Sequence, residues 1–164
     1  MADTKKAGST VVKFPDKRGS DKAAETKWSK PVIGYGFTIA PSLLMQAQRR
    51  LGLSPLQFNI IVHLMDFWWE ADRKPFPSKK EIAERMNIHP RTVQKNIKAL
   101  EMHGLVKRIP RRTPAGDPGT NFYDLAGLVD QLKKLEPEFR EAKEQRQENR
   151  KAVGQPRGRR QAKN

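Results

Sequence analysis

The sequence predicts a mainly α-helical fold that carries one small β-hairpin. Segments that begin at Ser54, Ser78 and Pro90 each start with residues typical of a helix N-terminus, and apolar residues follow at helical spacing. After the third segment, apolar runs at 105–109 and 121–125 flank a stretch rich in proline and glycine. That order is typical of two strands joined by a bend. A further helix is expected over 126–152.

Composition favours one modest core with tails and a polyanionic partner. The chain has 164 residues, which is short of two full domains, and its net charge is +15 with a pI near 10.3. Residues 31–77 are nearly neutral, so they are the expected scaffold, whereas the rest of the chain is basic. A basic surface favours polyanions through counterion release, and nucleic acid is the commonest of these. A generically basic soluble protein or a ribosome-bound one has the same charge.

Several classes of protein are disfavoured. The chain has no cysteine, which excludes disulfides, thiolate metal sites and cysteine catalysis. Its first residues lack an apolar signal core and its apolar runs are too short to cross a bilayer, so a cytoplasmic protein is expected. His63, His89 and His103 lack a metal-binding spacing, and no nucleophile or phosphate-binding glycine motif is present. We expect no enzyme, cofactor, metal or small-molecule ligand.

The predicted organisation has four parts. Residues 1–36 are expected to be a disordered basic tail and residues 37–125 a folded domain, followed by the helix at 126–152 and a disordered basic tail at 153–164. Each tail either adds affinity for phosphates or is simply solvated.

The first half of the domain is expected to supply its support. A short helix precedes Gly52, with Leu44, Ala47 and Leu51 on one face. The next helix is capped by Ser54 and Gln57, and two apolar stripes predict burial on two sides, as a central support or half of a dimer contact. The stripes are Leu56, Ile60, Leu64 and Trp68, and Phe58, Ile61, Met65 and Trp69. The tryptophans are assigned to core or interface rather than to base stacking.

Two helices joined by a tight turn form the central motif. Ser78 and Glu81 predict a capping box, and Asn87 can adopt the left-handed conformation that ends a helix. His89 precedes a proline, which favours a cap-like geometry, and Pro90 opens the second helix, expected over 90–103.

The second helix is expected to present a basic outer face. Val93, Ile97 and Leu100 recur at helical spacing and should pack inward. The outer residues near its start suit base recognition in a major groove: Arg91, Thr92, Gln94 and Lys95. Lys98 is assigned to a phosphate. A merely solvated face would explain the polarity, but it would not explain why every charge on that face is positive.

The hairpin, at 107–120, is expected to supply further DNA contacts. It carries basic residues that suit phosphates or a minor groove: Lys107, Arg108, Arg111 and Arg112. Ser78 and Lys79, at the start of the first motif helix, are also assigned to the DNA backbone.

The segment from about Phe37 to Leu125 resembles the winged helix-turn-helix proteins of bacteria, plasmids and phages, such as MarR-like and GntR-like regulators. The shared patterns are "P-S-x-x-x-I-A", "T-V-x-x-x-I-x-x-L-E-x-x-G-L-V" and "N-x-Y", which occur here from Pro77, Thr92 and Asn121. The resemblance implies sequence-specific binding of duplex DNA, in transcriptional regulators or in phage and plasmid replication proteins. Asn87 and His89 depart from the more usual glycine and serine of the turn.

The C-terminal helix leaves two roles open. An apolar row could dock on the domain or form a dimer seam: Leu125, Leu128, Leu132, Leu135 and Phe139. Pro137 is expected to end this helix or to start another.

The function predicted is sequence-specific binding of double-stranded DNA by a transcriptional regulator, with a homodimer through the central or C-terminal helix left open. The alternative is a plasmid or phage replication-initiation or partition factor that binds origin repeats. RNA binding is disfavoured because the major groove of A-form RNA does not admit a helix. A winged helix that binds only protein is the remaining alternative.

Overall fold

The computed structural model describes residues 17–112 and 119–154 and divides the chain into two units, 1–37 and 38–164. The first unit contains helices α1 (Lys17–Trp28) and α2 (Lys30–Ile33). The expectation of disorder over 1–36 is therefore wrong for this part. Ala23, Ala24 and Glu25 are strong helix formers, and they outweigh the low apolar content that suggested disorder. The rest of that tail, 1–16, and the basic end, 155–164, lie outside the described residues.

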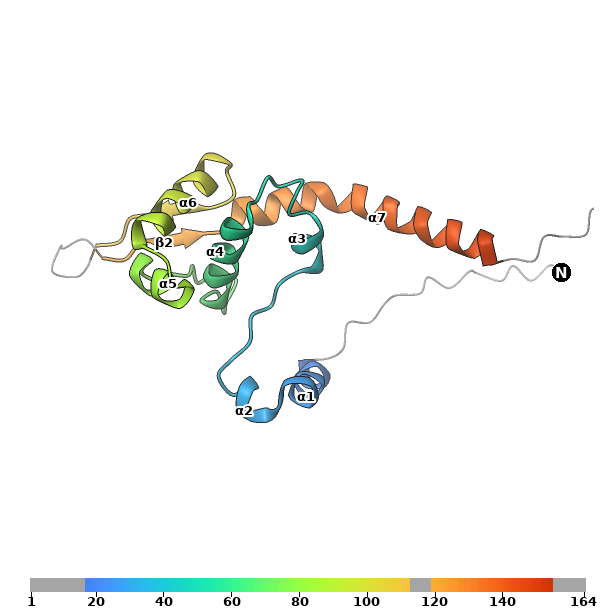
Figure 1. Ribbon diagram of the computed structural model, residues 1–164, viewed down its shortest axis with the longest axis horizontal. Helices are drawn as coiled ribbons and strands as arrows, with labels where there is room; N and C mark the ends of the chain where they lie inside the picture. Colours follow the sequence, from blue (N-terminus) through green and yellow to red (C-terminus); the bar gives the residue numbers. More distant parts are fainter. Residues whose placement is uncertain (1–16, 113–118, 155–164) are drawn as a thin grey trace, which may run out of the picture. The chain divides into compact units, whose positions relative to one another are not determined.

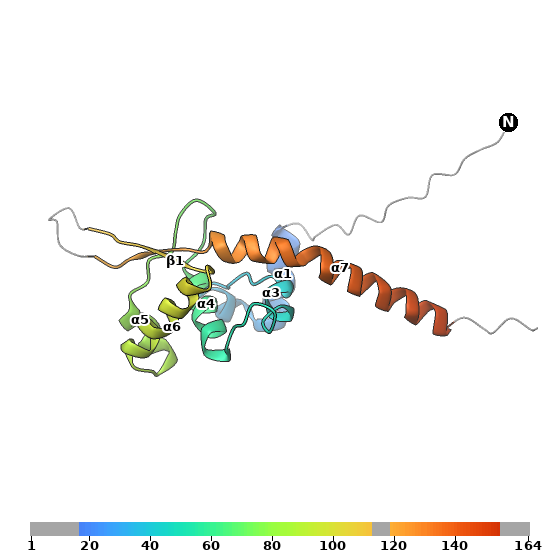
Figure 2. The same cartoon turned by 90° about the horizontal axis from the view of Figure 1, so that it is seen from above.

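The second unit is mainly helical with a two-stranded antiparallel hairpin, as predicted (Figure 1). Its elements are, in order, α3 (Ser42–Gln46), α4 (Pro55–Asp66), α5 (Lys79–Met86), α6 (Pro90–Met102), β1 (Lys107–Ile109), β2 (Phe122–Asp124) and α7 (Ala126–Gly154). In both views the hairpin and α7 extend in opposite directions from the body formed by α4, α5 and α6 (Figures 1 and 2).

One apolar core joins these elements. α4 contributes Ile60, Ile61 and Leu64 to it, and α5 contributes Ile82 and Ala83, all at most 1% exposed. The apolar row of α6 closes the core from the other side, while the hairpin and α7 add Tyr123 and Leu128. The core therefore fixes α5 and α6 against α4, and this leaves the opposite faces of α5 and α6 in solvent.

Helix α4 begins as predicted but ends early. Ser54 and Gln57 form the reciprocal capping box, with Gln57 N–H donating to Ser54 Oγ at 3.2 Å. The helix stops at Asp66 because the next two amides donate three residues back, which tightens the last turn. The two tryptophans thus lie beyond the helix. Trp68 packs on the core, but Trp69 is 70% exposed, so its predicted burial is wrong within this chain.

The strands are shorter than the apolar runs that predicted them. Leu105 and Val106 are buried, but their amides donate to the Leu100 carbonyl at the end of α6, and the Leu105 carbonyl accepts from Leu128. These groups are therefore not available to a strand ladder. Pairing begins at Lys107, which lies opposite Asp124.

Helix α7 runs through Pro137, which contradicts the expectation that this proline ends or starts a helix. A proline inside a helix costs about 3 kcal/mol, mainly through one missing hydrogen bond and a clash with the preceding turn. Because Pro137 has no N–H, the Lys133 carbonyl has no helical donor. Lys133 lies on an exposed side of the helix, where water can donate a hydrogen bond to this carbonyl instead. Leu132, Leu135 and Phe139 pack on the core on both sides of the proline and offset the cost. The apolar row of α7 therefore docks on its own domain.

Within the described ranges, no helix is both long enough and apolar enough to cross a membrane.

Candidate nucleic-acid interface

The turn between α5 and α6 is built by local residues in the predicted way. Asn87 adopts the left-handed conformation with φ 51° and ψ 47°, and it ends α5. His89 is the N-cap of α6, where its Nδ1 accepts a hydrogen bond from Arg91 N–H at 3.1 Å. Pro90 then occupies the first helical position. The departures from glycine and serine therefore preserve the turn geometry.

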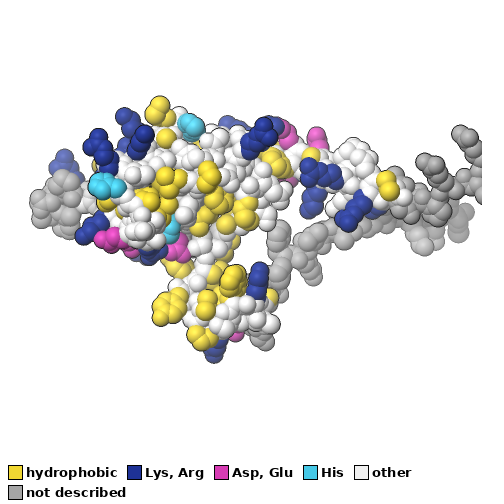
Figure 3. All heavy atoms as spheres, in the orientation of Figure 1, with side chains coloured by type: hydrophobic (Ala, Val, Ile, Leu, Met, Phe, Trp, Pro, Cys, Tyr) yellow, Lys and Arg dark blue, Asp and Glu magenta, His cyan; other side chains and the backbone are white. Residues whose placement is uncertain are grey.

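Helix α6 has two chemically distinct faces. Val93, Ile97 and Leu100 are fully buried, and they hold the helix against α4 and α5. The predicted base-contacting residues lie on the other face: Arg91, Gln94 and Lys95 are exposed and Thr92 is half-buried, and Lys98 is exposed beyond them. Lys and Arg side chains gather over this end of the molecule (Figure 3). The buried row thus orients a basic, hydrogen-bonding face toward solvent.

The start of α5 lies beside this face. Lys79 Nζ is 3.5 Å from Gln94 Oε1, so the structure brings one predicted backbone contact next to a predicted base contact. At the start of α5, Ser78 Oγ accepts a hydrogen bond from Glu81 N–H at 3.0 Å. The Glu81 carboxylate pairs with Arg85 instead of with the Ser78 amide, so only half of the predicted capping box forms. Ser78 and Lys79 also line an open hollow together with residues 119–121 of the hairpin.

Arg108 differs from the other predicted hairpin contacts because it is paired with an acidic side chain of α6. Its Nε donates to Glu101 Oε2 at 2.7 Å, and its backbone N–H donates to Glu101 Oε1 at 3.0 Å. These hydrogen bonds lower the pKa of Glu101 and raise the pKa of Arg108. The guanidinium thus joins β1 to the end of α6, and the DNA contact predicted for Arg108 stays a prediction.

Arg111 lies just beyond the end of β1, against two aromatic rings. Its guanidinium carbon is 5.1 Å from the Phe76 ring centre and 5.4 Å from the Phe122 ring centre, which are cation–π distances. The two rings meet edge to face at 5.6 Å. Lys107 at the start of β1 and Arg112 beyond its end are exposed, while residues 113–118 of the predicted hairpin segment lie outside the described residues.

Sequence reasoning missed the residues that hold the hairpin in place. Glu101 and Arg108 are seven residues apart and Phe76 and Arg111 are thirty-five apart, so neither pair has a helical or strand periodicity that would have identified it. A third missed cluster anchors α4 to α5, where Asp66 accepts from Thr38 at 2.6 Å and from Arg85 at 2.8 Å. The Thr38 hydrogen bond is the main reason that the pKa of Asp66 is lowered, and Arg85 adds to it.

The sequence of residues 51–106 matches the family model of a helix-turn-helix domain. The chain contains a winged helix-turn-helix domain. In this domain α5 and α6 are the two motif helices, α6 is the recognition helix, and the β1–β2 hairpin is the wing. The match to a helix-turn-helix domain supports DNA binding by this part of the chain.

Solved structures include proteins similar to this chain at low sequence identity. The N-terminal domain of the DnaD protein from Geobacillus kaustophilus is 20% identical, with a TM-score of 0.48 over 82% of this chain and 99% of that one. A possible transcriptional regulator from Methanosarcina mazei is 15% identical, with a TM-score of 0.42 over 69% and 96% of the two chains. A third, described as a transcriptional regulator, is 22% identical, with a TM-score of 0.35 over 62% and 72%. No curated protein matches the chain.

The described residues contain no group of three or more histidine, cysteine or acidic side chains arranged to hold a metal ion.

Proposed function

We propose that the protein recognises specific duplex DNA sequences through its recognition helix and regulates transcription at those sites. The observation that carries the proposal is the division of α6 into a fully buried apolar row and an outer face whose charged residues are all basic. The acidic Glu101 at its end is neutralised by Arg108. This face therefore presents only positive charge and hydrogen-bonding groups to a ligand.

The residue types on this face match the edges of base pairs in a major groove. Arginine can donate two hydrogen bonds to guanine, and glutamine can both accept from and donate to adenine. Arg91 and Gln94 lie in the first two turns of α6, which is where recognition helices usually contact bases. Thr92 and Lys95 complete the proposed base-contacting set.

The surrounding cations suit the phosphate backbone. Lys79 lies next to Gln94, and Lys98 continues the exposed face of α6. On the wing, Lys107 and Arg112 are exposed, and the Arg111 guanidinium stacks on the two phenylalanine rings. We assign these residues to phosphates or the minor groove, with Ser78 as a hydroxyl donor to a phosphate.

Selection of bound duplexes from a random DNA library at physiological salt tests the proposal. An enriched inverted repeat is expected, with half-sites about one helical turn apart, because a regulator that binds as a two-fold dimer requires that arrangement. Enriched tandem repeats would instead favour the replication or partition factor. If no sequence is enriched and binding disappears as salt rises, the recognition role of α6 is wrong.

A further inference from the structure

The inner face of α7 changes its chemistry along the helix. In its first half this face carries Leu128, Leu132, Leu135 and Phe139, which pack on the core. The same helical spacing continues beyond Phe139 with Lys143, Arg146 and Arg150. The face that docks α7 onto the domain therefore continues as a row of cations.

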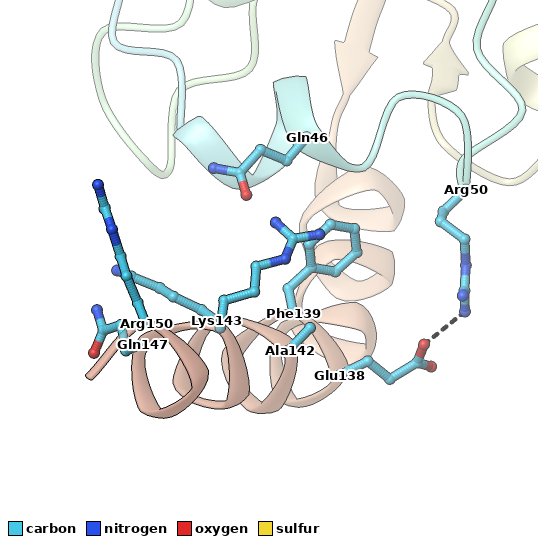
Figure 4. A pocket seen from close by; sticks show the side chains of 9 residues that line it. Gln46, Arg50, Glu138, Phe139, Ala142, Lys143, Gln147 and Arg150 are labelled. Carbon is cyan, nitrogen blue, oxygen red and sulfur yellow. Dashed lines mark hydrogen bonds and ion pairs between the residues drawn. The ribbon is translucent and has the colours of Figure 1, made fainter. Parts of the chain in front are cut away.

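These cations lie in a groove between α7 and the segment that contains α3. The groove has a volume of about 700 Å³, and Gln46 and Arg50 form its other wall (Figure 4). Arg50 donates to Glu138 at 2.8 Å, so this carboxylate is already neutralised. Within the described part of the chain, no carboxylate lies within ion-pair distance of Lys143, Arg146 or Arg150. The groove therefore has a net positive charge.

The acidic residues of this half of α7 are kept on another side. Glu141, Glu144 and Glu148 recur every three to four residues, and at about 100° per residue their mean direction is roughly opposite to the basic row. This segregation prevents neutralisation of the basic row along the helix. The row suits a ligand with repeated negative charge.

We propose that the basic face of α7 binds backbone phosphates of the same DNA duplex, outside the segment contacted by α6 and the wing. This inference rests on the proposed function. Lys143 and Arg150 are separated by about 10 Å along the helix, which corresponds to about three phosphates of one strand. The amides of Gln46 and Gln147 in the groove can donate further hydrogen bonds to phosphate oxygens.

A second copy of this chain fits the groove less well. The apolar row is already docked on its own domain, so a partner helix would find cations on this face instead of a hydrophobic seam. The carboxylates of another copy could pair with these cations. The basic face of one molecule would then contact a different, acidic face of the next molecule. Such contacts generate open chains of molecules unless they close into a ring.

The test is a pair of triple alanine variants that remove equal charge from α7. One variant changes Lys143, Arg146 and Arg150 to alanine, and the matched control changes Lys134, Arg140 and Lys151, which lie outside the groove. Alanine preserves helix propensity, and circular dichroism with thermal melting confirms that both variants fold. Affinity is measured against salt on a duplex limited to the selected site and on a longer duplex with flanks.

The basic-face variant should lack the extra affinity that flanking DNA gives to the wild type. On the longer duplex, the slope of log K against log salt should fall by about 0.9 for each phosphate that the variant no longer neutralises. The control variant should keep most of the extra affinity that flanking DNA provides. The inference is overturned if both variants lose the same affinity or if neither loses any. It is also overturned if the basic-face variant binds DNA like the wild type and differs only in self-association measured by sedimentation.

The inference and the proposed function fail differently. If alanine at Arg91 and Gln94 abolishes site preference while the α7 variants behave alike, only the inference is wrong. If the α6 substitutions leave site preference unchanged but the basic-face variant weakens binding to the longer duplex, the recognition role of α6 is wrong and the inference stands. If the wild type binds neither duplex, both are wrong.

Discussion

Glu101 shows how one side chain can serve the fold and the interface together. It accepts hydrogen bonds from the backbone and the guanidinium of Arg108, so it fixes the first strand of the wing against the end of the recognition helix. It also lies near the end of α6, the helix that carries the basic face, and its pairing with Arg108 offsets its negative charge there. These hydrogen bonds lower the pKa of Glu101, so it stays ionised and able to hold Arg108 at a lower pH than an isolated glutamate would.

Replacement of Glu101 by glutamine should destabilise the domain by about 1–2 kcal/mol, because a charged hydrogen bond to a partly exposed arginine becomes a neutral one. Urea denaturation followed by circular dichroism measures the change in the free energy of unfolding. Glu141→Gln, on the exposed part of α7, is the control and should have almost no effect. Equal small effects of the two substitutions would show that the Glu101–Arg108 pair does not hold the wing.

At the scale of elements, α7 approaches the end of α6 closely. The amide of Leu128 donates to the Leu105 carbonyl at 3.0 Å, and a Cβ at Gly127 would collide with the backbone carbonyl of Gly104. Gly104 itself has φ +67°, which turns the chain from α6 into the wing. The docking of α7 therefore depends on a glycine at its start as well as on its apolar row.

Gly127→Ala should destabilise the domain by about 1–3 kcal/mol, because the added methyl group must displace backbone and not a flexible side chain. This loss of stability opposes the gain in helix propensity that alanine normally gives. Thermal unfolding measures the balance, with Glu144→Ala in the exposed half of α7 as a control. A melting temperature that rises at Gly127→Ala would show that α7 does not press on the turn at Gly104.

For the whole molecule, the stability should decrease as the pH falls. The folded state lowers the pKa of Asp66 and Glu101, so both groups stabilise the domain above their unfolded pKa values, about 3.9 and 4.3. Their contribution disappears as the pH falls through the still lower folded values. Burial, followed by the charge of Arg85, lowers the pKa of His63, so its contribution is present above about 6.5 and disappears as the pH falls below that.

Melting temperatures measured between pH 8 and pH 3 test this decrease in stability. The range brackets the unfolded pKa values of histidine, about 6.5, and of the carboxylates, about 4. The wild type should become less stable in two steps, and Asp66→Asn should lack part of the lower one. A melting temperature that stays constant between neutral and mildly acidic pH would contradict the role of His63.

The sequence was sufficient for the parts of the molecule that are specified locally. Capping at Ser54, the left-handed Asn87 and the inward row of α6 depend on residues within one or two helical turns, and all three are present. The pairing of Arg108 and the stacking of Arg111 on aromatic rings depend on side chains that local periodicity does not connect. Local patterns therefore assigned Arg108 to DNA and did not reveal its pairing with Glu101.

The early end of α4 and the continuous α7 depend on tertiary packing in the same way. The chain leaves the α-helical path after Asp66, whose side chain is held by Thr38 and Arg85 from separate segments. The proline in α7 is tolerated because apolar residues on both sides dock on the core. Apolar spacing predicted a longer α4, and the proline predicted a break in α7. Interactions that form only in the folded domain decided both.

The central claim is that the outer face of α6 distinguishes one DNA sequence from another. The most direct measurement is the ratio of affinities for a selected site and a scrambled duplex of equal length, for the wild type, Arg91→Ala, Gln94→Ala and the control Lys134→Ala. Each α6 substitution should reduce discrimination by about 1–3 kcal/mol, because alanine cannot form the hydrogen bonds to the base edge. The control should keep the wild-type ratio. Equal reductions of affinity on both duplexes would mean that this face binds only phosphates, which would contradict the account.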